Sequence, residues 1–230
     1  MAAVGQYRFF MENTKAKKWL ASLVILGSLV LLFLSLYDFP PQPDPKPHRA
    51  LGKALAEHTA KLLGGGGRLI VIARDSSTFD IPAANIQMES FQQTLKRAGF
   101  AAATTRLLKV DPLRPVAVPP GDFFEIIRKA SETDVIVSFL GPPTLTGEQL
   151  ARLGEKRPRI LAVCSGGIPN QADLKKIFGE RLLQTAIISR KNPPPGSPKE
   201  GTPQAWFDHF YQVITPANLG DLSFNEPAGL

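Results

Sequence analysis

Polar turns follow three predicted strands of this chain. Seven residues in these turns are candidate ligand-binding residues: Asp75, Ser76, Ser77, Thr144, Ser165, Gly166 and Gly167. Backbone amides in a glycine turn that opens a helix can bind an anion. Ser, Gly and Asp are also the residues that a strand-to-helix loop requires for its own conformation. The sequence therefore leaves two interpretations of these turns, a ligand site and ordinary loop chemistry.

Two side chains beside the last of these turns are candidate nucleophiles, Cys164 and Ser165. A useful thiolate needs a base or a positive neighbour, and the histidines of the chain fall in a proline-rich segment, on a helix stripe and in the tail. Free cysteine is among the most buried residue types, so we expect Cys164 to be a core residue. We expect no catalytic residues, and a hydrolase using Ser165 or Cys164 stays an alternative.

The sequence favours neither a metal, a nucleotide nor a nucleic acid. The single cysteine excludes an internal disulfide and a cysteine-based zinc site, and no His, Asp or Glu cluster has ligand spacing. The glycines 64–67 precede a strand, whereas a phosphate loop follows one. The net charge is +7, but the first eighteen residues hold +3 of it and no basic run follows. We therefore expect no cofactor, no metal and no nucleic acid partner.

An uncharged stretch near the amino terminus predicts on which side of a membrane the remaining chain lies. Residues 19–37 form nineteen uncharged, mostly apolar positions between Lys18 and Asp38, about 28 Å as a helix. Trp19 and Tyr37 stand at its ends, as at membrane interfaces, and the basic tail 1–18 predicts a cytoplasmic amino terminus. We expect a single-pass helix in the inner (cytoplasmic) membrane with the remaining chain outside the cytoplasm.

A cleaved signal peptide is the alternative to this anchor. The apolar stretch is longer than a usual signal core, and residues 35–39 lack the small-residue pattern that signal peptidase recognises. The sequence therefore favours an uncleaved anchor.

Composition divides the remaining chain into three parts. Residues 38–48 hold five prolines, which predicts an extended polyproline stalk. Residues 49–192 alternate apolar runs with amphipathic helices, and residues 193–230 form a proline-rich linker with an aromatic carboxyl-terminal segment. We expect one folded domain, 49–192, between the stalk and this last segment.

Five short apolar runs predict the strands of that domain, at 68–73, 100–108, 135–140, 160–164 and 182–189. Amphipathic stretches between them predict helices, with N-caps at Asp122 (capping box with Glu125), Thr146 (with Gln149) and Asn170. Continuous apolar strands between helices indicate a mostly parallel sheet that is covered on both faces. The fold class is α/β: one flavodoxin-like, mostly parallel five-stranded sheet with helices on both faces, preceded by one transmembrane helix.

Aromatic residues repeat at helical spacing in the last segment. The stripe comprises Trp206, Phe207, Phe210, Tyr211 and Ile214. We expect it to be a helix that docks back onto the domain. A partner-binding helix is the alternative, in which Trp206, Phe207, Phe210 and Tyr211 form an interface.

The order of elements over residues 68–190 resembles one lobe of the type I periplasmic binding proteins, the substrate-binding family of ABC importers. Three stretches carry the resemblance: 68–77, the helix ending at 91–100, and 133–137 with 159–163. The resemblance implies the sheet order 2-1-3-4-5 and a site at the carboxyl ends of strands one, three and four, where the polar turns fall. We expect no second lobe and no hinge in this chain.

We expect a non-enzymatic, membrane-anchored extracytoplasmic domain that binds a protein partner or the cell envelope, as part of a transport or envelope complex. Its expected partners are the membrane, through residues 19–37, and a protein or a second copy. The alternatives are an anchored solute-binding lobe, whose cleft another copy completes, and the hydrolase.

Overall fold

The computed structural model describes residues 4–36, 43–64, 66–77, 80–100, 103–109, 117–155, 157–164 and 171–221. The chain divides into two compact units, Met1–Gln42 and Pro43–Leu230.

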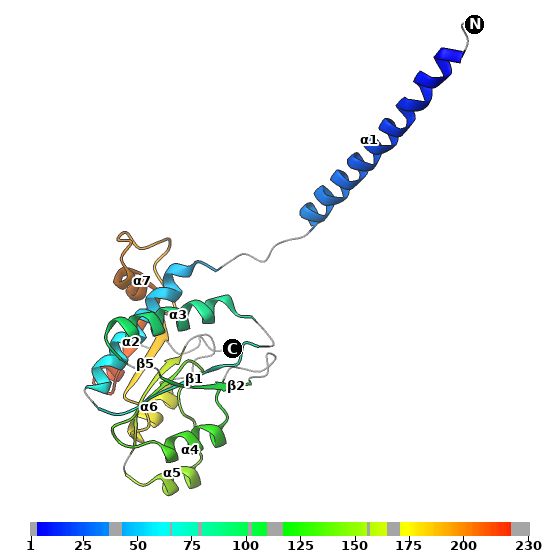
Figure 1. The fold of residues 1–230 in the computed structure, drawn as a ribbon. Helices are drawn as coiled ribbons and strands as arrows, with labels where there is room; N and C mark the ends of the chain where they lie inside the picture. The colour runs from blue at the N-terminus through cyan, green and yellow to red at the C-terminus, as the bar shows by residue number, and fades with distance from the viewer. Residues whose placement is uncertain are drawn as a thin grey trace, which may run out of the picture. The chain divides into compact units, whose positions relative to one another are not determined.

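The first unit contains one long helix, α1 (Val4–Leu36) (Figure 1). Its segment Lys15–Ser35 is long and apolar enough to cross a membrane, and none of that segment is buried by other residues. Trp19, for example, is 74% exposed. The hydroxyl of Ser22 donates to the carbonyl oxygen of Lys18 at 3.0 Å, which satisfies this polar group within the helix. The predicted apolar helix is therefore present, and a signal sequence near an amino terminus would meet the same criteria of length and composition.

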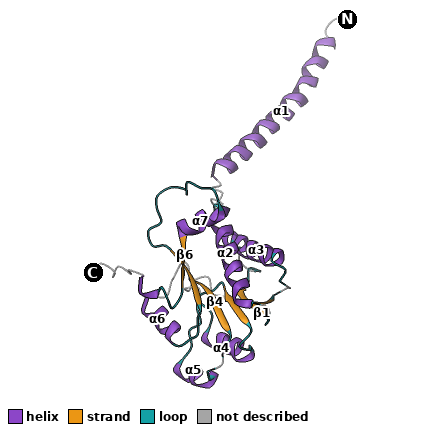
Figure 2. Cartoon of the chain, turned by 90° about the vertical axis from the view of Figure 1, so that its left-hand side faces the viewer, coloured by secondary structure: helices purple, strands orange, loops and turns teal. Residues whose placement is uncertain are grey.

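The second unit alternates helices and strands (Figures 1 and 2). Its elements are α2 (Pro45–Leu63), β1 (Leu69–Arg74), α3 (Pro82–Arg97), β2 (Thr104–Leu108), α4 (Pro120–Lys129), β3 (Val135–Ser138), α5 (Gly147–Leu153), β4 (Arg159–Cys164), α6 (Gln171–Gly179), β5 (Thr185–Ser189), α7 (Pro203–Phe210), β6 (Tyr211–Ile214) and the 3-10 turn Leu219–Asp221. The five predicted strands are all present, although β2, β3 and β5 are shorter than predicted.

The strands form one sheet in the order β2-β1-β3-β4-β5-β6. The first five are parallel, which confirms the predicted fold class and the order 2-1-3-4-5. The sixth strand was not predicted and pairs antiparallel with β5. The prediction of one helix across 206–214 is wrong at its end, because Tyr211-Gln-Val-Ile214 is an aromatic and β-branched run that gains ladder hydrogen bonds by joining the sheet.

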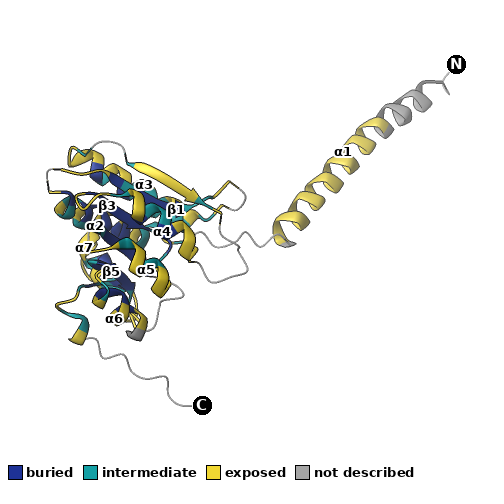
Figure 3. Ribbon diagram, turned by 90° about the horizontal axis from the view of Figure 1, so that it is seen from below, coloured by how far each residue is buried: buried dark blue, intermediate teal, exposed yellow. Residues whose placement is uncertain are grey.

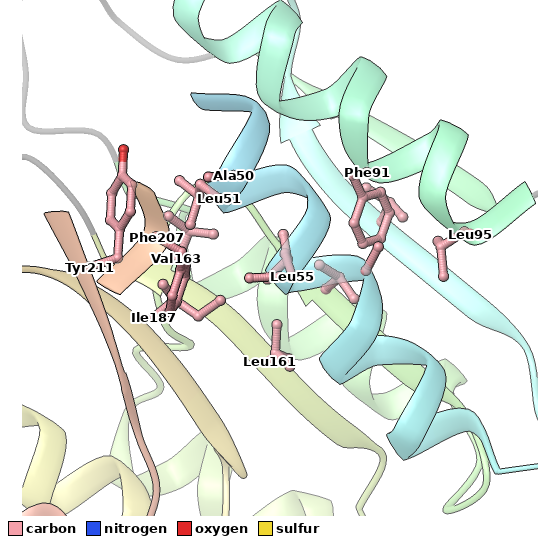
Figure 4. Close-up of a cluster of buried hydrophobic side chains, with 14 of the residues drawn as sticks. Ala50, Leu51, Leu55, Phe91, Leu95, Leu161, Val163, Ile187, Phe207 and Tyr211 are labelled. Atoms are coloured by element: carbon pink, nitrogen blue, oxygen red, sulfur yellow. The ribbon is translucent and has the colours of Figure 1, made fainter. Parts of the chain in front are cut away.

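Helices cover both faces of this sheet (Figures 2 and 3). On one face, α2, α3 and α7 bury a cluster that includes Leu51, Leu55 and Phe91 (Figure 4). On the other face, α4 and α6 bury a second cluster around Phe123, with α5 side chains packed against it. Two separate apolar clusters on opposite faces explain why the central strands are apolar throughout rather than alternating.

Helix α2 begins inside the predicted stalk. The carboxylate of Asp44 accepts a hydrogen bond from the amide of Lys46 at 3.0 Å and caps the helix, while Pro45 occupies its first turn. Proline has no amide hydrogen to lose there, and its fixed φ suits the helix. The extended stalk predicted for 38–48 is therefore wrong over residues 45–48, which are helical.

The predicted helix caps have mixed outcomes. Thr146 and Gln149 form the predicted capping box, with hydrogen bonds of 3.2 and 3.0 Å. Asp122 is not an N-cap, because α4 begins earlier, at Pro120, after Pro119. Glu125 instead pairs with the guanidinium of Arg128 at 2.8 Å. Asn170 lies outside the described residues.

A buried carboxylate joins the strands at the amino-terminal edge of the sheet. Asp134 accepts hydrogen bonds from the amide of Arg68, the amide of Ser131 and the guanidinium of Arg68, each at 2.8 Å. Burial alone would raise the pKa of Asp134, but the hydrogen bonds from the Arg68 side chain and the two amides outweigh it and hold that pKa below its usual range. The charged form is therefore stabilised, and it fixes the segment before β1 to the turn before β3.

Gly67 makes this close approach possible. Its φ is +104°, and a Cβ added there would lie 2.0 Å from the carbonyl oxygen of Thr133. A side chain would thus meet both an unfavourable backbone conformation and a backbone atom that cannot move freely.

We expect Gly67→Ala to lower the free energy of unfolding by about 2 kcal/mol, from positive φ and overpacking together. Urea denaturation followed by circular dichroism measures this loss. Gly99→Ala is the matched control, since Gly99 has φ +81° but nothing within 4 Å of an added Cβ. Equal losses in the two variants would contradict the proposed close contact.

Candidate functional site

The carboxyl ends of β1, β3 and β4 lie along one edge of the sheet. The parallel register aligns Ile72 with Ser138 and Ser138 with Ala162, so the three strands end near one another. This is the edge at which the polar turns were predicted to lie. Ser165, Gly166 and Gly167 lie outside the described residues, so the turn after β4 stays a prediction.

Asp75 begins the turn after β1 and fixes that turn. Its carboxylate accepts a hydrogen bond from the amide of Ser77 at 3.0 Å, and its own amide donates to the carbonyl oxygen of Leu108 at 2.8 Å. Hydrogen bonds from Ser77 lower the pKa of Asp75, so this side chain is ionised at neutral pH. Ser76 and Ser77 are exposed. The geometry matches an Asx-turn, and a carboxylate held in this way still has a second oxygen for a ligand.

Two hydroxyls follow β3 in different environments. Thr144 is exposed, after the buried Pro142 and Pro143. Ser138 is fully buried at the end of the strand, and its hydroxyl oxygen accepts a hydrogen bond from the amide of Leu140 at 3.2 Å. The sequence did not single out Ser138, because a serine at the end of an apolar run resembles an ordinary strand terminus. Among the described residues of this edge, Asp75, Ser76, Ser77 and Thr144 are the predicted candidates that a ligand could reach.

Cys164 is a core residue. Its side chain is 2% exposed and lies in the apolar cluster under α4 and α6. Burial raises the pKa of the Cys164 thiol to about 12, so almost none of it is thiolate at neutral pH. Cys164 is therefore inert as a nucleophile in this structure.

Two of the histidines, His48 and His58, are half-buried on α2. On α2, the ring of His48 shares a hydrogen bond of 3.1 Å with the amide group of Gln87 on α3. Burial lowers the pKa of His48 and that of His58, which favours their neutral forms. Among the residues that the structure describes, no group of three or more His, Cys, Asp or Glu side chains is arranged to hold a metal ion.

The aromatic residues of the carboxyl-terminal segment pack against α2. Trp206, Phe207 and Tyr211 are buried, and the rings of Trp206 and Phe210 stack at 5.9 Å. The ammonium group of Lys46 lies 5.3 Å from the centroid of the Trp206 ring. The predicted docking onto the domain is therefore observed for these rings. Their use by a partner protein stays a prediction, and Phe210 is the member of the four that remains partly exposed.

Two cavities flank β2, and sequence reasoning missed both. The larger, about 530 Å³, lies between α3 and the strands β1 and β2. Its lining residues are Val71, Phe91, Gln92, Leu95, Lys96, Phe100, Ala103 and Thr105. The smaller, about 380 Å³, lies on the opposite face and includes Arg106, Asp122 and Glu125. The residues of β2 are mostly polar or charged, although the segment was predicted as a strand. This composition could have indicated that helices leave this edge of the sheet uncovered.

No protein-family model matches the sequence, and no curated protein matches it. The structure is similar to several solved structures. One is an ABC transporter solute-binding protein from Burkholderia graminis, in complex with D-arabinose, with a TM-score of 0.46 and 15% identity over 78% of this chain and 62% of that chain. Another is a sugar ABC transporter protein from Actinomyces odontolyticus, with a TM-score of 0.43 and 9% identity over 77% of this chain and 64% of that chain.

A third similar structure is the XylFII–LytSN complex, with a TM-score of 0.42 and 13% identity over 74% of this chain and 60% of that chain. This chain therefore spans less than two thirds of each of these proteins. Solute-binding proteins of ABC transporters are the class whose single lobe the sequence resembles, so the predicted resemblance is confirmed. At these identities the likeness concerns the fold alone.

Proposed function

We propose that this chain is a membrane-anchored, extracytoplasmic α/β domain that acts by binding, as a non-enzymatic part of a transport or cell-envelope complex. The observation that carries the proposal is the apolar surface of α1. Within Lys15–Ser35, twelve large apolar side chains are exposed, from Trp19 to Leu34. Full exposure of such a side chain to water costs about 1.5–3 kcal/mol of free energy relative to an apolar environment. A lipid bilayer is therefore the environment that fits this helix.

The orientation of the anchor follows from charge. Lys15, Lys17 and Lys18 immediately precede the uncharged stretch, and the residues after it begin with Asp38. Basic flanks are retained on the cytoplasmic side, so residues 43–230 lie outside the cytoplasm.

The binding role is supported by the side chains that are available for contact. Cys164 is buried and protonated at neutral pH, which leaves Ser165 as the predicted nucleophile of the alternative hydrolase. Polar groups at the carboxyl edge of the sheet, the half-buried Asp75 and the exposed Thr144 among them, can form hydrogen bonds with a ligand or a partner. Loss of a hydrolytic activity in Ser165→Ala with an unchanged fold would favour the hydrolase instead.

An anchored solute-binding lobe is the second candidate. The strand order favours it, because that order gathers the turns after β1, β3 and β4 at one edge. In this candidate a second copy would complete the cleft around the solute. A dimer that buries the strand ends would support this candidate over a protein-binding role.

Cysteine labelling in cells tests the anchor and its orientation. The buried Cys164 makes the natural chain a silent background for a membrane-impermeant maleimide. We expect Ser197→Cys, at an exposed position of the second unit, to react in intact spheroplasts. Asn13→Cys, in the basic tail, is expected to react only after the membrane is permeabilised. Both variants are expected to stay in the pellet after alkaline carbonate extraction.

The natural chain is the control and is expected to react only after denaturation. An amino-terminal epitope tag distinguishes an anchor from a signal peptide, because cleavage would remove the tag from the mature chain. Labelling of Asn13→Cys but not of Ser197→Cys in intact spheroplasts would contradict the proposed orientation. Recovery of the tagged chain in the soluble fraction would exclude the anchor.

A further inference from the structure

Strand β2 leaves one edge of the sheet open. Among the described residues, β2 pairs with β1 alone and ends the strand order. The carbonyl oxygen of Leu108 accepts a hydrogen bond from the amide of Asp75, which follows β1, so the backbone groups of Leu108 point toward β1. Backbone direction alternates along a strand, so Thr105 and Leu107 direct their amide and carbonyl groups outward. An unpaired row of this kind is a template for another strand.

The residues of β2 are also mostly exposed, as the yellow colour of this strand shows (Figure 3). Residues Thr104 to Leu107 are exposed, and Leu107 is 59% exposed. Among the described residues, every other large apolar side chain with such exposure lies in α1. Native sheets usually protect an edge by a covering element or an inward charge, so an open edge that displays leucine indicates an interaction surface.

The larger cavity opens beside Thr105 of β2, whereas Leu107 is in the lining of the smaller cavity. The register pairs Val71 with Thr105, and both residues line the larger cavity on the α3 side of the sheet. Phe91 and Leu95 form apolar walls of the cavity of about 530 Å³. A strand added to β2 would place alternate side chains over this cavity.

Charge defines the chemistry of that strand. Between Glu89 and Asp111 the chain contains four basic side chains and no further acid, and the four are Lys96, Arg97, Arg106 and Lys109. Lys96 is in the lining of the larger cavity. On the opposite face, Asp122 and Glu125 line the smaller cavity, and Glu125 is already paired with Arg128 and Lys129. The edge therefore complements a negative segment.

We propose that the β2 edge binds an extended acidic segment of a partner protein by strand addition, with an apolar side chain of that segment in the cavity between α3 and β2. A peptide supplies both amide donors and carbonyl acceptors at the spacing of the edge, which a lipid surface does not. A second copy would bring two basic edges together, and like charges oppose that pairing. The inference rests on the proposed binding role and names its partner class.

Three synthetic peptides test the inference on the purified full chain in detergent micelles. All alternate Val or Ile with one polar residue, which is Glu, Thr or Lys. We expect the Glu peptide to bind at least about tenfold more tightly than the Thr peptide, and the Lys peptide to bind least. Hydrogen exchange is expected to slow at the amides of Thr105 and Leu107 when the Glu peptide binds.

Thr105→Pro is the decisive variant, because it removes an outward amide and leaves the hydrogen bonds to β1 in place. We expect Thr105→Pro to weaken binding of the Glu peptide by about tenfold or more. Leu107→Lys is also expected to weaken this binding, because it removes the exposed apolar side chain of the edge. Circular dichroism confirms that each variant is folded. Ser197→Pro and Ser197→Lys are the matched controls, at an exposed position outside the edge, and are expected to bind as the natural chain does.

Three outcomes would overturn the inference. One is equal or absent binding of the three peptides, and another is binding of the Glu peptide that Thr105→Pro leaves unchanged. The third is occupation of the edge by a second copy or by lipid. A second copy would give a crosslinked dimer of the natural chain that Thr105→Pro abolishes. Lipid would give phosphatidylglycerol binding that requires Lys96 and Arg106 but not Thr105. Since peptide binding is measured on purified chain, its failure leaves the cellular labelling result unaffected.

Discussion

Phe207→Ala is expected to lower the free energy of unfolding of the Pro43–Leu230 unit by about 3–5 kcal/mol. Phe207 is 4% exposed, and its ring lies 5.7 Å from that of Tyr211 in the cluster that α2 covers (Figure 4). Truncation removes this buried surface and leaves a cavity between α2, α7 and the sheet. Denaturation of the full chain in detergent by urea measures the change.

Phe210→Ala is the matched control on the same helix. Its ring is partly exposed, so its removal costs less apolar burial, and we expect a loss of less than about 2 kcal/mol. A loss below about 1 kcal/mol in Phe207→Ala would mean that α7 and β6 unfold independently of the remaining strands. Cooperative unfolding with a large loss would place residues 203–214 inside the domain rather than in an appended segment.

Asp134→Ala is expected to lower the free energy of unfolding by about 3 kcal/mol. The side chain of Asp134 is 2% exposed and accepts from the amides of Arg68 and Ser131, which would both lose their partner. A buried amide without an acceptor costs about 1–3 kcal/mol. Thermal and urea denaturation measure the loss. Glu132→Ala, an exposed acid in the same turn, is the control and is expected to change stability by less than about 0.5 kcal/mol.

The same carboxylate gives stability a defined pH dependence. The pKa of Asp134 is lower in the folded chain than in the unfolded chain, where it is about 3.9. The stabilisation is therefore fully present above the unfolded pKa and is lost as the pH falls from about 4 toward the folded pKa. Asp134→Asn removes this titration, so its denaturation midpoint is expected to fall less steeply below pH 4. Parallel pH profiles of the two chains would contradict this role.

Local sequence patterns were sufficient to predict the five parallel strands of the sheet. Val135-Ile-Val-Ser138 and Arg159-Ile-Leu-Ala-Val-Cys164 are apolar runs between helix signals, and both became central strands. The capping box of Thr146 and Gln149 was predicted because it involves residues three apart in sequence. Burial of Cys164 followed from its place on an apolar strand. These features depend on neighbours in the chain, which a single sequence displays.

Features that depend on tertiary contacts were missed. The stalk was predicted as extended to residue 48 because prolines dominate it, yet Pro45 is compatible with a helix start and the buried Ala50 and Leu51 stabilise α2. Strand β6 exists because β5 offers it an edge, which no local pattern reveals. The cavity beside β2 arises from the distance between α3 and that strand, which depends on packing. For the candidate site, the sequence predicted only which polar residues occupy the turns after the strands.

The order in which elements leave the ribosome has a consequence for α2. This helix is the first part of the second unit to be synthesised, whereas its partners Trp206 and Phe207 come about 150 residues later. Contacts of such long sequence separation form late and slow folding. Until α7 is synthesised, the part of the apolar face of α2 that Trp206 and Phe207 cover stays available to chaperones, proteases and other nascent chains. Premature termination before residue 203 would therefore yield an aggregation-prone fragment rather than a smaller version of the domain.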